Sequence, residues 1–224
     1  MTAPYRSSVE IFCSHFRKQF KDISTVSEEL HRKILYCLLL DPLAHAANSS
    51  VRGSRAKVVL LLRTLCDWPD ADRVSLFQLT LALRESRRTR FRLYREAKRQ
   101  LASRPARNRT LLSESPHFRE LEPLVADKEE RHILEMCTYA NLFYTYRSNL
   151  VHEFREPGYG FDWGRNSNEP YYGKSAFGQR ELVFPVSFVA GTVSKAIERL
   201  EPHLLAVKQA PHSKFKFGSQ WRWK

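Results

Sequence analysis

Apolar residues recur at helical spacing through most of the first 156 residues, and this pattern restricts the possible folds more than any other feature. Near the N-terminus, steps of three and four positions place one set of side chains on a single helix face: Val9, Phe12, Cys13, Phe16 and Phe20. The same criterion predicts helices over residues 30–40, 56–65 and 185–207. The chain is therefore expected to be all-α and to form a helical bundle.

Two further helices are expected to be long. One runs from Arg73 to Ala102, and the other runs from Lys128 to Glu156, because no Gly or Pro intervenes before Pro157. Asp127 is followed three residues later by Glu130, which makes a capping box for the second of these helices. At 1.5 Å per residue this helix would be roughly 43 Å long, the longest element of the bundle.

The composition changes after this helix. Residues 157–178 contain five of the eight glycines together with several aromatic residues. Two short stretches, 169–172 and 180–184, are predicted to pair as a β-hairpin. Residues 157–184 are therefore expected to form a Gly- and aromatic-rich loop or hairpin insertion before the last helix.

The domain organisation expected from these patterns is simple. Residues 1–207 form a single helical domain, and residues 208–224 form a basic, aromatic C-terminal tail. No apolar run approaches the roughly 18 residues that cross a bilayer, and no signal-peptide pattern opens the chain. The sequence predicts a soluble, cytoplasmic protein with no membrane partner.

Positive charge is concentrated in one part of the chain. There are 37 Lys and Arg residues against 24 Asp and Glu, a net charge of +13, and residues 84–109 hold eleven of the basic and two of the acidic residues. This local excess favours a polyanionic partner, nucleic acid before a membrane surface, over a merely solvated helix face. The side chains expected to contact phosphate are Arg84, Arg88, Arg92, Arg95, Lys98 and Arg99.

The cysteines and carboxylates do not indicate a metal site. The four cysteines are widely spaced in apolar helical contexts and are expected to be reduced core residues. Three aspartates lie close together in the sequence at a predicted helix boundary: Asp67, Asp70 and Asp72. At such a boundary, aspartates more commonly act as caps and turn residues than as metal ligands. No metal and no cofactor are therefore expected.

One face of the segment 128–156 combines apolar residues with a single charge. Its apolar members alternate at steps of three and four: Ile133, Met136, Ala140, Phe143, Leu150 and Phe154. Arg147 stands within this stripe, and because a guanidinium keeps its proton, it needs an anionic partner, a cleft or an interface. A structural ion pair is the alternative to a functional role.

His152 follows Arg147 by five residues. On a helix this separation turns the two side chains apart by about 140°, so one copy of the helix does not aim both at one point. Two antiparallel copies related by a two-fold axis would bring both pairs into one groove, which predicts a homodimer. The helix dipole, Glu153 and Glu156 favour the protonated imidazole, which suits a proton donor or shuttle.

The string from Tyr146 to Glu153, Tyr-Arg-Ser-Asn-Leu-Val-His-Glu, resembles the HEPN superfamily (higher eukaryotes and prokaryotes nucleotide-binding). The family's pattern is an Arg, four to six residues and then a His, near the end of a long helix, and the resemblance covers about twenty residues. Family members commonly carry Asn or Asp directly after the Arg. Here Ser148 occupies that position and Asn149 comes next, so either residue is a candidate for the polar helper.

The resemblance implies a metal-independent endoribonuclease that works as a homodimer, often as a toxin or defence effector restrained by an antitoxin or regulator in trans. RNA would be the substrate, because its 2′-hydroxyl attacks the adjacent phosphorus. Arg147 would stabilise charge on the phosphoryl oxygens and His152 would move the proton, with Tyr146, Glu153 and Glu156 in support.

Two other functions stay open. One is a non-catalytic helical protein of the same superfamily that binds nucleic acid or a protein partner through the basic segment 84–109 and the C-terminal tail. The other is an enzyme acting on nucleotides, which rests on the aromatic, Gly-rich loop after residue 156.

Overall fold

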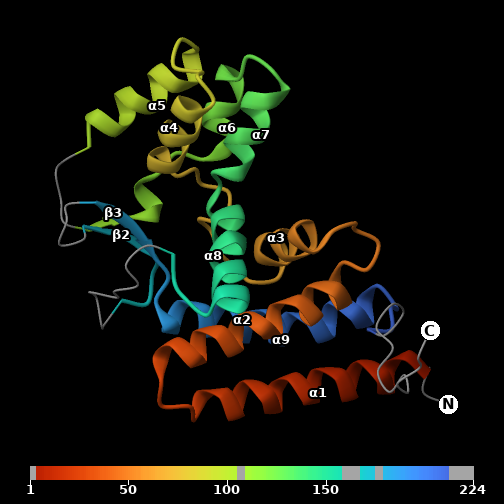
Figure 1. The fold of residues 1–224 in the computed structure, drawn as a ribbon. Coiled ribbons are helices and arrows are strands. Elements are labelled where there is room, and N and C mark those ends of the chain that lie inside the picture. Colours follow the sequence, from red (N-terminus) through yellow and green to blue (C-terminus); the bar gives the residue numbers. More distant parts are fainter. Residues whose placement is uncertain (1–3, 105–108, 158–166, 175–178, 212–224) are drawn as a thin grey trace, which may run out of the picture. The chain divides into compact units, whose positions relative to one another are not determined.

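The computed structural model describes residues 4–104, 109–157, 167–174 and 179–211 (Figure 1). These residues form two compact units. The first unit takes in residues up to 68, residues 150–155 and the chain from 189 onward; the second takes in residues 69–149 and 156–188. The prediction of a single helical domain over residues 1–207 stays a prediction.

The first unit contains the helices that the apolar periodicity predicted. They are α1 (Pro4–Ser24), α2 (Glu29–Ala47), α3 (Ser54–Thr64) and most of α9 (Val186–Ala206). Phe12 and Phe16 of α1 are buried, and their rings lie 4.7 Å apart. α2 contacts both α1 and α3, and Arg17 of α1 forms an ion pair with Glu201 of α9.

The second unit is built from shorter helices around one apolar cluster. The helices are α4 (Leu76–Glu85), α5 (Arg92–Ala102), α6 (Phe118–Leu121), α7 (Lys128–Met136) and most of α8 (Tyr139–Glu153), with the 3₁₀ turns η1 (Leu112–Glu114) and η2 (Glu122–Leu124). α4 lies against α5 and α7 (Figure 1). The buried residues of the cluster are Val74, Leu76, Leu79, Leu83, Leu93, Ala97, Leu121, Leu134 and Cys137.

A three-stranded antiparallel sheet completes the second unit. Its strands are β1 (Arg109–Leu111), β2 (Tyr171–Lys174) and β3 (Arg180–Val183), in the order β1-β2-β3. Tyr172 lies in the central strand β2, where it pairs with Thr110 of β1 and with Leu182 of β3. The pairing of the predicted hairpin is confirmed, whereas no strand was predicted at the position of β1.

The prediction of one helix from Arg73 to Ala102 is wrong, because α4 ends at Glu85. Arg87 adopts a left-handed conformation with φ of +56°. Its backbone N–H donates to the Arg84 carbonyl, and that of Arg88 donates to the Leu83 carbonyl at 2.7 Å. These two bonds are the Schellman arrangement that ends many helices, here without the usual glycine.

The prediction of one helix from Lys128 to Glu156 is also wrong. α7 ends at Met136 and α8 begins at Tyr139 (Figure 1). At the interruption, the Cys137 carbonyl accepts from the backbone N–H of Ser75 at 3.0 Å, and the backbone N–H of Tyr139 donates to the Arg73 carbonyl at 2.9 Å. The chain leading into α4 therefore takes backbone groups that an uninterrupted helix would use internally.

The described chain is thus mostly helical with a small sheet, and the helical prediction is confirmed at that level. No described helix has both the length and the apolar content needed to cross a bilayer. The C-terminal tail predicted over 208–224 lies outside the described residues from residue 212 onward, as do parts of the 157–184 insertion.

Candidate nucleic-acid interface and the helix of Arg147 and His152

A surface pocket of about 570 Å³ opens in the second unit, between α4, α5 and the start of β3. The residues lining it are Phe77, Gln78, Thr80, Leu81, Arg84, Tyr94, Lys98, Leu101, Gln179 and Arg180. Three of them are cationic, and none of these described residues is an Asp or a Glu. The pocket therefore carries a positive potential that favours an anionic ligand.

Two of the pocket cations have no protein partner among the described residues. Arg84 is exposed on the last turn of α4, and Lys98 is exposed on α5. Neither side chain forms a hydrogen bond or an ion pair with a described residue. Since no described carboxylate neutralises them, both charges are available to an anion that enters the pocket.

The third cation, Arg180, is held by two contacts at the edge of the sheet. Its guanidinium lies over the Phe77 ring, 5.0 Å from the ring centroid, and its Nη1 donates to Thr110 Oγ1 at 3.0 Å. These contacts tie β3 to α4 and to β1 and fix the position of the charge. Arg180 was not predicted as a site residue, and its sequence signal is a single arginine at the start of the predicted second hairpin strand.

Two aromatic side chains accompany the cations. Phe77 is half-buried, with its ring 4.9 Å from that of the buried Tyr172. Tyr94 is half-buried on α5, on the same helix as Lys98. Aromatic faces beside cations are the combination that stacks an unpaired base and contacts its phosphate.

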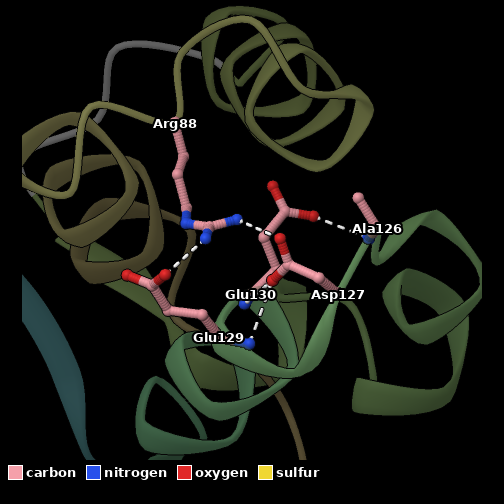
Figure 2. Close-up of polar contacts among 5 residues, drawn as sticks. All are labelled: Arg88, Ala126, Asp127, Glu129 and Glu130. Atoms are coloured by element: carbon pink, nitrogen blue, oxygen red, sulfur yellow. Dashed lines mark hydrogen bonds and ion pairs between the residues drawn. The ribbon is translucent and has the colours of Figure 1, made fainter.

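Arg88 was predicted to contact phosphate, but its charge is engaged within the protein. Nη1 donates to Asp127 Oδ2 at 2.6 Å, and Nη2 donates to a Glu129 oxygen (Figure 2). These two carboxylates raise the pKa of Arg88 above its ordinary value, with Glu129 the larger influence. Arg88 therefore joins the α4–α5 turn to the start of α7.

Asp127 is the N-cap of α7, as predicted, although the capping box differs from the expected one. Its Oδ1 accepts from the backbone N–H groups of Glu129 and Glu130, both at 2.9 Å. The fully buried Glu130 carboxylate accepts from the backbone N–H of Ala126, not from that of Asp127 (Figure 2). The reciprocal bond therefore reaches one residue further upstream than in the standard box.

The remaining predicted phosphate contacts lie on α5. Arg99 forms two hydrogen bonds with Glu96, at 2.8 and 2.5 Å, and this pairing lowers the pKa of Glu96 to about 2. Arg92 and Arg95 are exposed and form no hydrogen bond or ion pair with a described residue. Of the six predicted cations, the structure thus brings Arg84 and Lys98 into the pocket, with Arg92 and Arg95 elsewhere on the surface.

Arg147 is buried in α8, with 4% of its surface exposed. The preceding residue, Tyr146, is also buried, and its ring lies 4.9 Å from that of Phe184. Ser148 and Asn149 are half-buried. The stripe that contains Arg147 is therefore largely covered within a single chain, including the fully buried Phe143.

His152, in contrast, is exposed in the last turn of α8. Glu153 beside it pairs with Arg155, whose Nη2 lies 2.5 Å from Glu153 Oε2, and Glu156 follows the helix half-buried. The boundary between the two compact units falls after Asn149. One helix therefore carries a buried guanidinium and an exposed imidazole, and these two residues fall in different units.

The four cysteines lie in the core, and two of the three clustered aspartates form ion pairs. All four cysteines are free and buried, which confirms that they are core residues. Asp67 pairs with Arg199 at 3.1 Å, and Asp70 pairs with Arg73 at 2.8 Å. In the described part of the chain, no group of three or more His, Cys, Asp or Glu side chains is arranged to hold a metal ion.

No family model matches this chain, and no curated protein or solved structure is found to be similar to it. The resemblance to the HEPN superfamily therefore depends on the string around Arg147 and His152 alone.

Proposed function

We propose that this protein binds single-stranded nucleic acid, with RNA as the first ligand to test, through the pocket between α4, α5 and β3. The observation that carries this proposal is the convergence of Arg84, Lys98 and Arg180 with Phe77 and Tyr94 in one pocket that no described carboxylate lines. Charge and aromatic surface thus occur together, on residues from three elements.

The physical basis is the way in which single strands are held. An unpaired base offers a flat face that stacks on an aromatic ring, worth about 1–3 kcal/mol per base, while cations follow the backbone phosphates. A base within a duplex is already stacked and paired, so it does not enter a pocket of this kind unless it is first extruded. Arg92 and Arg95, exposed on α5, provide charge for further phosphates of the same strand.

The experiment is a salt titration of binding to a fluorescent single-stranded RNA, with a duplex of the same sequence and a single-stranded DNA beside it. The wild type should prefer the single strands. Lys98→Gln and Arg84→Gln should each weaken binding and lower the slope of log Kd against log salt by roughly 0.7. Lys18→Gln, which removes an exposed lysine of α1 in the first unit, is the matched control and should have little effect.

Equal affinity of the wild type and the two pocket variants would contradict the proposal, and so would the absence of any measurable binding to single strands. A preference for the duplex would mean that the protein binds double-stranded nucleic acid, and the proposed stacking of bases on the aromatic rings would then be wrong.

Metal-independent endoribonuclease activity is the second candidate function. The observation in its favour is that Arg147 and His152 lie on one continuous helix with the imidazole exposed. Its difficulty is the burial of the guanidinium, which must reach a phosphate to stabilise the charge that develops there. A homodimer that opens this face, with Ser148 or Asn149 as the polar helper and a regulator in trans, belongs to this second proposal.

Incubation of the protein with RNA and EDTA separates the two functions. Cleavage that survives the chelator and is lost in His152→Ala would support the ribonuclease. RNA that stays intact while it binds, with the same affinity for the wild type and His152→Ala, would support the binding protein. A toxin or defence role becomes a question only after cleavage has been observed.

A further inference from the structure

We infer that the pocket between α4, α5 and β3 receives the end of a nucleic acid chain, and that its ligand is a nucleotide carrying a terminal phosphate monoester. This inference rests on the proposed function and deepens it, because it names the part of the strand that the pocket takes. Two ligands carry this group: the phosphorylated end of a strand and a free mononucleotide. Both present a nucleoside with a doubly charged phosphate.

The number of positive charges in the pocket favours a doubly charged ligand. Arg84, Lys98 and Arg180 place three positive charges around one volume of about 570 Å³. An internal phosphodiester carries one negative charge, whereas a phosphate monoester carries about 1.5 to 2 at pH 7. Three cations that line one pocket match the end of a chain better than its middle, where successive phosphates are spaced out along a groove.

The contacts of these three cations also favour a doubly charged ligand. Arg180 is fixed by the Phe77 ring and by Thr110, so its charge does not follow a moving ligand. Arg84 and Lys98 have no hydrogen-bonded partner among the described residues. Three cations that line one pocket repel one another, so the pocket gains more from a dianion than from a single negative charge.

The other residues that line the pocket fit a nucleotide. Tyr94 provides aromatic surface for a base, while the Phe77 ring lies beneath the Arg180 guanidinium. The polar side chains of Gln78 and Gln179 also line the pocket. A volume of about 570 Å³ also lies within the usual range of small-molecule sites, roughly 300 to 1,000 Å³. The pocket can therefore hold one nucleotide with its terminal phosphate, while Arg92 and Arg95 lie outside it.

The test compares one short single-stranded RNA with three different ends: a 5′-phosphate, a 3′-phosphate, and hydroxyl groups at both ends. Binding of the wild type should be roughly ten- to a hundredfold tighter for one of the phosphorylated forms than for the hydroxyl form, as expected for one or two additional charge-assisted hydrogen bonds. The preference should shrink between pH 7.5 and pH 5.5, because the second ionisation of a phosphate monoester has a pKa near 6.

Two sets of variants locate the effect. Arg84→Gln, Lys98→Gln and Arg180→Gln should reduce the preference for the phosphorylated end. Arg92→Gln and Arg95→Gln should weaken all three RNAs equally and keep the preference, because these side chains do not line the pocket. Lys18→Gln should change neither the affinity for the three RNAs nor the preference for the phosphorylated end. Thermal unfolding of each variant verifies that it is folded, and Arg84→Gln and Lys98→Gln, both at exposed positions, keep the test decisive if Arg180→Gln disturbs the sheet.

A competition experiment distinguishes the end of a strand from a free mononucleotide as the ligand. Adenosine 5′-monophosphate should compete with the phosphorylated RNA, and adenosine should not. If RNA binds equally well with and without a terminal phosphate, the inference is wrong although the proposed function stands. If the mononucleotide binds and no single-stranded RNA does, the proposed function is wrong although the pocket takes its inferred ligand. Loss of the preference in Arg92→Gln but not in Lys98→Gln would overturn the assignment to this pocket.

Discussion

Arg88 and Asp127 lie 39 positions apart in the sequence, and their side chains meet at 2.6 Å (Figure 2). Arg88 belongs to the turn that ends α4, and Asp127 caps α7. The same carboxylate therefore satisfies the backbone at the start of one helix and neutralises the cation at the end of another. This contact couples the formation of the α4–α5 turn to that of α7, within the second unit.

Removal of the Arg88 charge should lower the thermal stability of the protein. In the variant Arg88→Gln, the carboxylates of Asp127 and Glu129 lose the cation that they share. The α4–α5 turn also loses its link to α7. Thermal unfolding followed by circular dichroism should give a lower Tm, with a difference from the wild type that narrows at high salt. Arg131→Gln is the matched control, since Arg131 forms one exposed pair with Glu122 and should show a smaller shift.

The charge of Asp127 should make stability depend on pH in the acid range. Its hydrogen bond from the backbone of Glu130, followed by that from Arg88, holds the pKa of Asp127 below its ordinary value of 3.8. Because the folded state has the lower pKa, the stabilising contribution is present above about pH 4 and is lost as the pH falls through the folded pKa.

Asp127→Asn keeps a side chain that caps helices and removes the charge. Urea unfolding from pH 7 down to pH 3 should show a deficit relative to the wild type that is full at neutral pH and declines below about pH 4. Glu10→Gln, at an exposed carboxylate of α1, should show no comparable pH-dependent difference. A constant deficit at every pH would mean that the charge is not involved.

Arg87→Gly should stabilise the protein by about 0.5–1 kcal/mol. Arg87 has a φ of +56°, a left-handed conformation that costs an ordinary residue roughly 1–2 kcal/mol and glycine almost nothing. Part of this gain is offset by the greater freedom of glycine in the unfolded chain. Arg90→Gly makes the same change in the same turn at a residue without positive φ and should be neutral or destabilising. Urea unfolding of the two variants measures whether each substitution raises or lowers the free energy of unfolding.

The native cysteines should react slowly with a thiol reagent. Burial raises the pKa of Cys66 and of Cys137 to about 12 and that of Cys13 to about 11. The reactive thiolate is therefore scarce at pH 8, and reaction with an aromatic disulfide reagent should be at least about a hundredfold slower than in urea. Ser113→Cys, at an exposed position of η1, should add one fast thiol. A fast native cysteine would contradict the burial.

The sequence predicted the helices that depend on local periodicity and missed the two interruptions. The face formed by Phe12 and Phe16 is visible in the residues of α1 alone. The break between α7 and α8 depends instead on backbone bonds from Ser75 and Arg73, more than 60 residues earlier. β1 was missed for the same reason, because Thr110 becomes a strand residue only by pairing with Tyr172.

The candidate site was predictable only in part. The excess of charge in residues 84–109, where eleven basic residues stand against two acidic ones, pointed to Arg84 and Lys98. It also pointed to Arg88, whose partners Asp127 and Glu129 come from a distant segment. Arg180 reaches the pocket through the sheet, so no local pattern could have grouped it with α4 and α5.

The burial of Arg147 leads to a final prediction, which bears on the second candidate function. Arg147→Ala should lower the free energy of unfolding by about 2–3 kcal/mol, because it removes a buried side chain and leaves its surroundings unfilled and unpaired. His152→Ala and the control Arg155→Ala, both at exposed positions near the end of the same segment, should stay within about 0.5 kcal/mol of the wild type. Urea unfolding gives all three values. A neutral Arg147→Ala would mean that the guanidinium is free of the core, and the ribonuclease would then become the stronger of the two proposals.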